Sequence, residues 1–180
     1  MVTLRCTEKL RKRLRLPKLG DAPASTTALG DWFGNPVSTR HARVILLVSE
    51  KSRLAVLVAA RHLDRFEDRF REALYDLLLS LDVPAEAAAR ERDAMSDFCY
   101  AKTNSRSVLG TMNDYTFPLR ILLEEEPERT LQEIALHLSE TPLGPFGYKR
   151  PKDLVRSLLG ARPGKVLEFD PGRLDREAGG

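Results

Sequence analysis

Over the first sixty positions, apolar and polar residues alternate or cluster in the way that is typical of β-strands. Residues 2–6 alternate in character, which is the period of a strand with one buried face. Residues 44–49 and 54–59 are dense in Val, Ile and Leu, and the polar link between them suits a hairpin. Residues 29–37 predict a further strand, so three adjoining strands with short connections indicate an antiparallel meander.

From residue 63 onward the apolar period changes to that of a helix. Apolar side chains recur every three or four positions, which places them on one face of each helix. Pro84 suits the first turn of a helix, and Ser105 can accept a hydrogen bond from the backbone at a helix start. The predicted helices span residues 63–81, 84–95, 106–124 and 130–138, and residues 98–102 predict one more strand.

Strands that come early and helices that come late predict an α+β fold, with a small, mostly antiparallel sheet of about four or five strands covered by helices. The chain has 180 residues, of which 42% are hydrophobic, and this is enough for one domain with a buried core. We place that domain at residues 1–145. Residues 146–180 are rich in Gly and Pro, and we expect them to form a partly ordered extension.

Composition excludes several classes of protein. No apolar stretch approaches the roughly 20 residues that cross a bilayer, so no membrane partner is expected. The basic residues near the N-terminus are not followed by an apolar segment, so no signal peptide is expected. Two cysteines, Cys6 and Cys99, are too few for a disulfide framework. We therefore expect a cytoplasmic protein.

The sequence carries no motif for a common cofactor or metal. It has no phosphate-binding loop, no dinucleotide-binding glycine pattern and no nucleophile elbow. The three histidines, His41, His62 and His137, lie far apart without metal-ligand spacing. Neither a metal site nor a bound cofactor is expected.

The charge is distributed unevenly along the chain. The net charge is +3, but residues 1–60 carry +7 and residues 61–140 carry −7. A basic first third suits an anionic partner such as nucleic acid. The alternative, which the small net charge favours, is that the basic and acidic segments pack against each other or form solvated faces. A short helix, predicted from residue 8 to just before Pro17, is the clearest candidate for a nucleic-acid contact. It lacks aromatic residues on which bases could stack. The alternative is an amphipathic helix whose charged face is solvated. Its basic residues are Lys9, Arg11, Lys12, Arg13 and Arg15.

The densest run of polar side chains surrounds the start of the helix at residue 106. At 100° per residue, Arg106, Gly110 and Asn113 share one stripe, roughly opposite the apolar face. Gly in mid-helix costs about 1 kcal/mol relative to Ala, and the close approach of a ligand is one way to account for it. The helix N-terminus and nearby cations are suited to hold an anion. The predicted ligand-binding residues are Lys102, Asn104, Arg106, Asn113 and Asp114.

The alternative interpretation of this stripe is a buried polar network that fixes the helix to the sheet. Arg106 would then pair with Asp114 or Asp31. Pro118 removes the backbone donor that the Asp114 carbonyl needs, so a kink is expected there.

Four segments resemble an uncharacterised bacterial family, whose members are described as domains of unknown function or as plasmid open-reading-frame-three-like proteins. The segments are residues 1–7, 29–33, 102–114 and 140–142, and the most specific motif is Arg-Ser-Val-Leu-Gly-x-Met-Asn-Asp at residues 106–114. The resemblance covers residues 1–145. It implies a small intracellular bacterial protein, and it carries no reaction, substrate or catalytic residue.

We favour a non-enzymatic binding module that recognises an anionic or nucleic-acid partner. The alternative is an enzyme acting on a phosphate- or nucleotide-containing substrate. In that enzyme Arg106 would clamp the phosphate, Asn113 would orient the substrate, and Asp114 would serve as base or metal ligand. A third hypothesis is a partner of another protein, in which the polar stripe has only a structural role.

Overall fold

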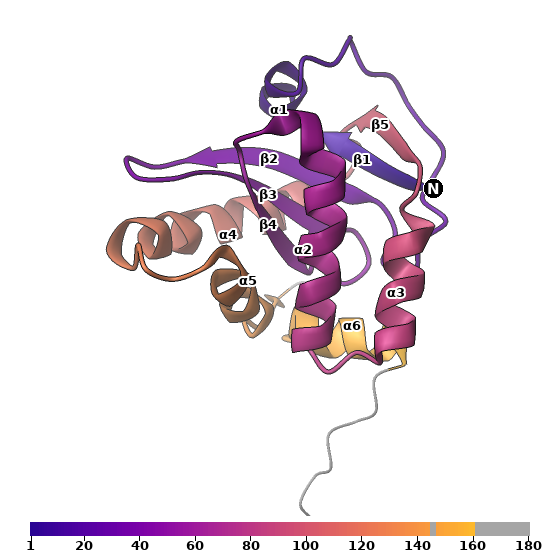
Figure 1. The fold of residues 1–180 in the computed structure, drawn as a ribbon, viewed down its shortest axis with the longest axis vertical. Helices are drawn as coiled ribbons and strands as arrows, with labels where there is room; N and C mark the ends of the chain where they lie inside the picture. The colour runs from indigo at the N-terminus through magenta and orange to yellow at the C-terminus, as the bar shows by residue number, and fades with distance from the viewer. Residues whose placement is uncertain (145–146, 161–180) are drawn as a thin grey trace, which may run out of the picture.

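The apolar runs form a five-stranded mixed sheet in the computed structural model, which describes residues 1–144 and 147–160. The strands lie in the order β4-β3-β2-β1-β5. This confirms an α+β fold in which helices cover the sheet (Figure 1). The strands are β1 (Val2–Cys6), β2 (Trp32–Ser38), β3 (Arg43–Ser49), β4 (Ala55–Ala59) and β5 (Phe98–Lys102).

Half of the strand pairings are parallel, so the expectation of a mostly antiparallel sheet holds only for the meander. β2, β3 and β4 form the antiparallel meander that the sequence predicts. β1 pairs in parallel with both β2 and β5. The connections that lead to β2 and β5 are long enough to return the chain to the end from which it started, and such connections permit parallel pairing.

The helices cover both faces of the sheet. Figure 1 shows α2 in front of the strands and α4 behind them. α4 continues through Pro118 over five turns or more, with its buried residues on the side of the sheet. The helices are α1 (Glu8–Arg13), α2 (Phe66–Ser80), α3 (Ala85–Ala94), α4 (Arg106–Glu125), α5 (Leu131–Ser139) and α6 (Pro151–Leu159), with a 3-10 turn η1 (Leu63–Arg65) before α2. None of these helices has the length and apolar character that a bilayer crossing requires.

α6 lies in the segment that the sequence assigned to a partly ordered extension. Pro151 occupies its first turn, Gly160 caps its end in the left-handed conformation, and Val155 is fully buried. Figure 1 places it beneath the ends of α2 and α3, where Arg156 donates a hydrogen bond to the Leu81 carbonyl. Residues 161–180 of the predicted extension lie outside the described part of the chain.

Two buried carboxylates fix the long connection between α1 and β2. Asp31 forms an ion pair with Arg5, whose Nε lies 2.6 Å from Asp31 Oδ2, and it accepts a hydrogen bond from the Ser25 backbone. Glu91 on α3 accepts the backbone N–H groups of residues 28 and 29. Buried charges need such partners, since an unpaired carboxylate in the interior is strongly unfavourable. The connection is therefore held to the sheet and to α3.

Gly34 allows α1 to pack on β2. A Cβ at position 34 would overlap Cδ2 of Leu10, the fully buried residue of α1. We expect Gly34→Ala to lower the free energy of unfolding by about 1–3 kcal/mol, because overpacking displaces α1 or its neighbours. Urea unfolding measures this loss. Leu10→Ala vacates the same space, so adding Gly34→Ala to that variant should cost little; a Gly34→Ala variant as stable as the wild type would contradict the packing.

Candidate functional site

Four of the five strands end at the same edge of the sheet. β2 and β5 run parallel to β1, and β4 shares their direction because β2 and β4 are both antiparallel to β3. The segments that follow these strands therefore emerge at one edge, which we call the carboxyl edge. They are residues 7–21, 38–43, 60–65 and 102–106.

The carboxyl edge is strongly basic. Its four segments contain twelve Lys or Arg residues and three Asp or Glu residues. Two of the acids are already paired, Glu8 with Arg11 and Asp21 with Lys102. A surface with so many cations and so few acids attracts anions over a distance of several ångströms. The exposed cations are Lys9, Lys12, Arg15, Lys18, Arg40, Arg43, Arg61, Arg65, Lys102 and Arg106.

α1 is anchored in a way that directs its charges outward. Thr7 caps the helix by accepting a hydrogen bond from the Leu10 backbone, and its own N–H donates to the Gly34 carbonyl. Leu10 is buried, whereas the basic residues around it are exposed or half-buried. Leu10 thus anchors the short helix against β2, and the four cations of α1 remain on its outer side.

A cavity of about 550 Å³ lies at the carboxyl edge between the end of α1 and the segment after β4, and we call it the α1–β4 cleft. Arg13 Nη2 lies 3.5 Å from the carbonyl oxygen of Ala60, and both residues line the cleft. The lining residues are Arg13, Leu14, Arg15, Ala60, His62, Leu63 and Asp64. Two of the five predicted nucleic-acid residues, Arg13 and Arg15, therefore meet a segment about fifty residues away in the sequence.

The five predicted ligand-binding residues, which lie at the end of β5, in the following loop and on α4, are all exposed. Lys102, Asn104 and Arg106 lie at the carboxyl edge, and Asn113 and Asp114 follow two turns farther along α4. A Cβ at Gly110 on the same stripe would meet open space. The buried network that was the alternative interpretation is therefore excluded, and a role in ligand binding stays a prediction.

The ion pairs proposed for that network do not form. Asp31 pairs with Arg5 instead, and within residues 1–144 and 147–160 no ion pair joins Arg106 to Asp114. Phe117, on the same stripe, leaves 73% of its surface exposed. The outward face of α4 is thus accessible along much of its length.

Because the side chain of Arg106 is exposed, we expect it to contribute little to the stability of the fold. We expect Arg106→Ala to change the free energy of unfolding by no more than about 0.5 kcal/mol. Thermal unfolding of the two proteins side by side measures this. A drop in Tm of many degrees would show that the guanidinium supports the fold.

Three groups have strongly raised pKa values because they are buried in the fold. Burial raises the pKa of the Cys6 thiol to about 12, so this thiol stays protonated at neutral pH and is a poor nucleophile. Burial also raises the pKa of Tyr115, whose hydroxyl donates a hydrogen bond to the Arg53 carbonyl. The pKa of Tyr100 is also raised. Burial is the larger cause, and the hydrogen bond that its hydroxyl donates to Glu67 is the second. Among the described residues, no group of three or more His, Cys, Asp and Glu side chains is placed to hold a metal ion.

The sequence of residues 3–154 matches the family model described as a domain of unknown function (DUF6933). The chain belongs to this family. The resemblance to a family without an assigned reaction is thereby confirmed. The DUF6933 match begins in β1 and ends within α6, so it contains the whole carboxyl edge. Comparisons with curated proteins and with solved structures gave no match.

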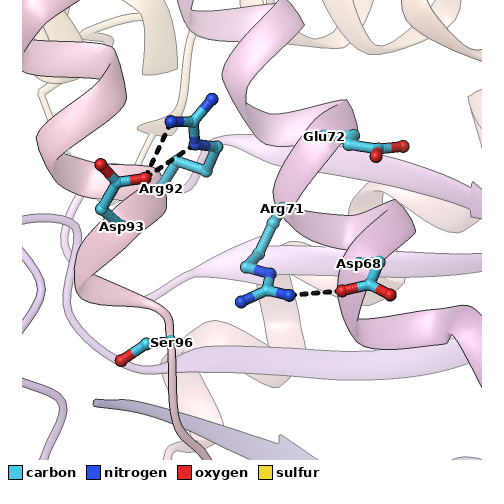
Figure 2. A pocket seen from close by; sticks show the side chains of 6 residues that line it. All are labelled: Asp68, Arg71, Glu72, Arg92, Asp93 and Ser96. Carbon is cyan, nitrogen blue, oxygen red and sulfur yellow. Dashed lines mark hydrogen bonds and ion pairs between the residues drawn. The ribbon is translucent and has the colours of Figure 1, made fainter.

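The DUF6933 domain has a second charged cavity, of about 470 Å³, between α2 and α3 (Figure 2). Figure 2 shows Arg71 directed toward Asp68 and Arg92 toward Asp93, and both pairs are ion pairs. Arg92 also stacks over the Tyr75 ring at 4.7 Å. Because both guanidinium groups already face acids, this cavity is less suited to an anion than the cations of the carboxyl edge are.

Sequence reasoning did not find the contributions of residues 38–43 and 60–65 to the edge. The signal was present in Arg40, Arg43, Arg61 and Arg65, which flank apolar strands. Their convergence depends on the direction of each strand in the sheet, and the local pattern does not encode that direction.

Proposed function

We propose that this protein is a binding module whose carboxyl edge contacts the phosphate backbone of a nucleic acid. The observation that supports this most strongly is the convergence of twelve cations, from four separate segments, on one edge of the sheet. Cations that are spread along the sequence but gathered in space form the electrostatic footprint of a polyanion site.

The extent of the edge favours a polymer over a small anion. Neighbouring strands lie about 4.8 Å apart, so the edge from β4 to β5 spans about 19 Å. That length accommodates several consecutive phosphates of a nucleic-acid strand. The cations occur along the whole row, from Arg61 after β4 to Lys102 at the end of β5.

The composition of the edge favours binding without sequence preference. The four segments contain no Phe, Tyr or Trp on which a base could stack. Phosphate contacts position a nucleic acid but do not read its bases. We therefore infer an interaction that is governed by charge.

The proposal is compatible with a cytoplasmic protein, since both Cys6 and Cys99 are free thiols. The bacterial, plasmid-associated origin implied by the family resemblance stays a prediction. The alternative of an enzyme for a phosphate-containing substrate also stays a prediction.

Fluorescence anisotropy with a labelled oligonucleotide of about 20 nucleotides, single-stranded and as a duplex, tests the proposal. With about four phosphate contacts, the logarithm of the affinity is expected to fall with the logarithm of salt concentration with a slope of about −3 to −4. Shuffling the base sequence should leave the affinity within a few-fold. Failure to bind at about 50 mM salt, or an affinity that salt does not change, would contradict the proposal.

A further inference from the structure

We propose that the α1–β4 cleft is a pocket for a phosphomonoester nucleotide, the chemical group shared by a nucleoside monophosphate and the phosphorylated end of a strand. This inference rests on the proposed function and deepens it, because it assigns a specific ligand group, a phosphomonoester, to one part of the carboxyl edge. The cleft is concave, and both cationic and apolar residues line it.

Three donors on the cleft walls suit a phosphate group. The Arg13 guanidinium makes one long hydrogen bond, from Nη2 to the Ala60 carbonyl, and its Nη1 makes no hydrogen bond within the described residues. Arg15 is exposed, and no hydrogen bond or ion pair joins its side chain to another residue of the described chain. His62 adds an exposed imidazole from the opposite wall. Planar guanidinium groups match the geometry of phosphate oxygens, and two of them reach this cleft.

The backbone places two of these donors in an unusual conformation. Arg15 has a φ of +57° and His62 a φ of +50°, in the left-handed region that residues other than Gly rarely adopt. Five such non-Gly residues occur in the described chain, and two of them line this one cleft. Such conformations concentrate at binding sites because the local geometry there is selected for the ligand.

Apolar residues that line the cleft suit the nucleoside. Leu14, Ala60 and Leu63 are half-buried, and they come from the same two segments as the three donors. Asp64 supplies an acceptor for a base N–H or a sugar hydroxyl, and its charge disfavours a phosphate group placed directly beside it. A volume of about 550 Å³ is in the range of pockets that hold small organic ligands and exceeds the need of a bare phosphate.

A strand end is distinguishable from a strand interior by charge. A phosphomonoester carries about −1.5 to −2 charges and three terminal oxygens, whereas an internal phosphodiester carries a single charge. Two arginines and an imidazole in one cleft therefore favour the terminal group. Cations on the open parts of the carboxyl edge can contact an internal phosphodiester equally well, so we expect no such preference there.

The test compares two oligonucleotides of about ten nucleotides that differ only in a 5′-phosphate or a 5′-hydroxyl, using the full chain in anisotropy measurements. We expect the wild type to bind the phosphorylated strand about tenfold more tightly, or better, at about 150 mM salt. Arg15→Gln and His62→Gln should bring this ratio close to one. Lys12→Gln, an exposed cation of α1 outside the cleft lining, should weaken both strands equally and keep the ratio.

A second arm separates the sources of the phosphate. A nucleoside 5′-monophosphate should raise the Tm of the wild type but not that of Arg15→Gln, and it should do so at lower concentration than inorganic phosphate. Equal effects of the monophosphate and inorganic phosphate would overturn the nucleotide pocket. A ratio near one in the wild type would also overturn the inference and leave the proposed function intact, whereas no binding of either strand would overturn both.

Discussion

Replacing Asp31 by Ala is expected to lower the free energy of unfolding by about 3–5 kcal/mol, the largest stability change that we expect from a single substitution. The side chains of Arg5 and Asp31 are 6% and 3% exposed, and their ion pair is 2.6 Å long. Asp31→Ala leaves the Arg5 guanidinium buried without its counter-charge and the Ser25 N–H without its acceptor. Urea unfolding, followed by the fluorescence of the single Trp32, measures the loss.

A double replacement separates the net contribution of the ion pair to the free energy of unfolding from the loss caused by leaving one buried charge unpaired. Exchanging a buried ion pair for apolar residues of similar size is often nearly neutral. Arg5→Met combined with Asp31→Leu is therefore expected to be more stable than either single variant. If Asp31→Ala lost less than about 1 kcal/mol, the pair would be solvated and the connection from α1 to β2 would be held by other contacts.

Reversing two charges of the carboxyl edge should have the largest effect on binding. Arg40 and Arg61 are exposed and come from different segments of the edge. Arg40→Glu with Arg61→Glu removes two phosphate contacts and adds two repulsive charges. We expect the affinity for an oligonucleotide to fall at least about tenfold at about 100 mM salt, and the salt slope to become shallower by about 2. Anisotropy titrations at several salt concentrations measure both.

The matched control reverses two exposed cations elsewhere. Arg90 on α3 and Lys149 before α6 are exposed and lie outside the four segments of the edge. Arg90→Glu with Lys149→Glu changes the net charge by the same amount, so a purely global effect would weaken binding equally in both proteins. We expect the control to lose affinity by no more than a few-fold, with its salt slope unchanged. Equal losses would show that the site is elsewhere or that net charge alone governs binding.

Local periodicity predicted the elements but not their mutual direction. The meander formed by β2, β3 and β4 was predictable because short connections leave adjacent strands only the antiparallel arrangement. The parallel pairing of β1 was not predictable, since it joins segments separated by a long connection. This pairing brings the four strand ends to one edge, so the site could not be drawn from the sequence.

The candidate residues differ in how far the sequence alone predicts their positions. The basic residues of α1 were found from composition, and the structure places Arg13 and Arg15 in the α1–β4 cleft. The helical spacing correctly put Arg106 and Asn113 on the face of α4 away from the apolar residues. The sequence carries no local signal for His62. Its left-handed backbone and its position beside the end of α1 depend on the fold.

The helix α6 shows how composition can mask a local signal. The Gly and Pro content of residues 146–180 predicted a partly ordered extension without a defined helix, yet two of these residues mark the limits of a helix. Pro151 has its φ fixed near the helical value at the first turn, and Gly160 accepts the left-handed conformation at the end. Between them Val155 is fully buried, which ties the helix to the rest of the fold.

The most direct measurement of the central claim is a map of amide chemical shifts during titration with a short oligonucleotide. The proposed function predicts that the largest shifts occur in residues 7–21, 38–43, 60–65 and 102–106, and that these shifts become smaller together as the salt concentration is raised. Amides of α3 and of α6 should move little. Shifts concentrated on those two helices, or spread evenly over the surface, would contradict a nucleic-acid site at the carboxyl edge.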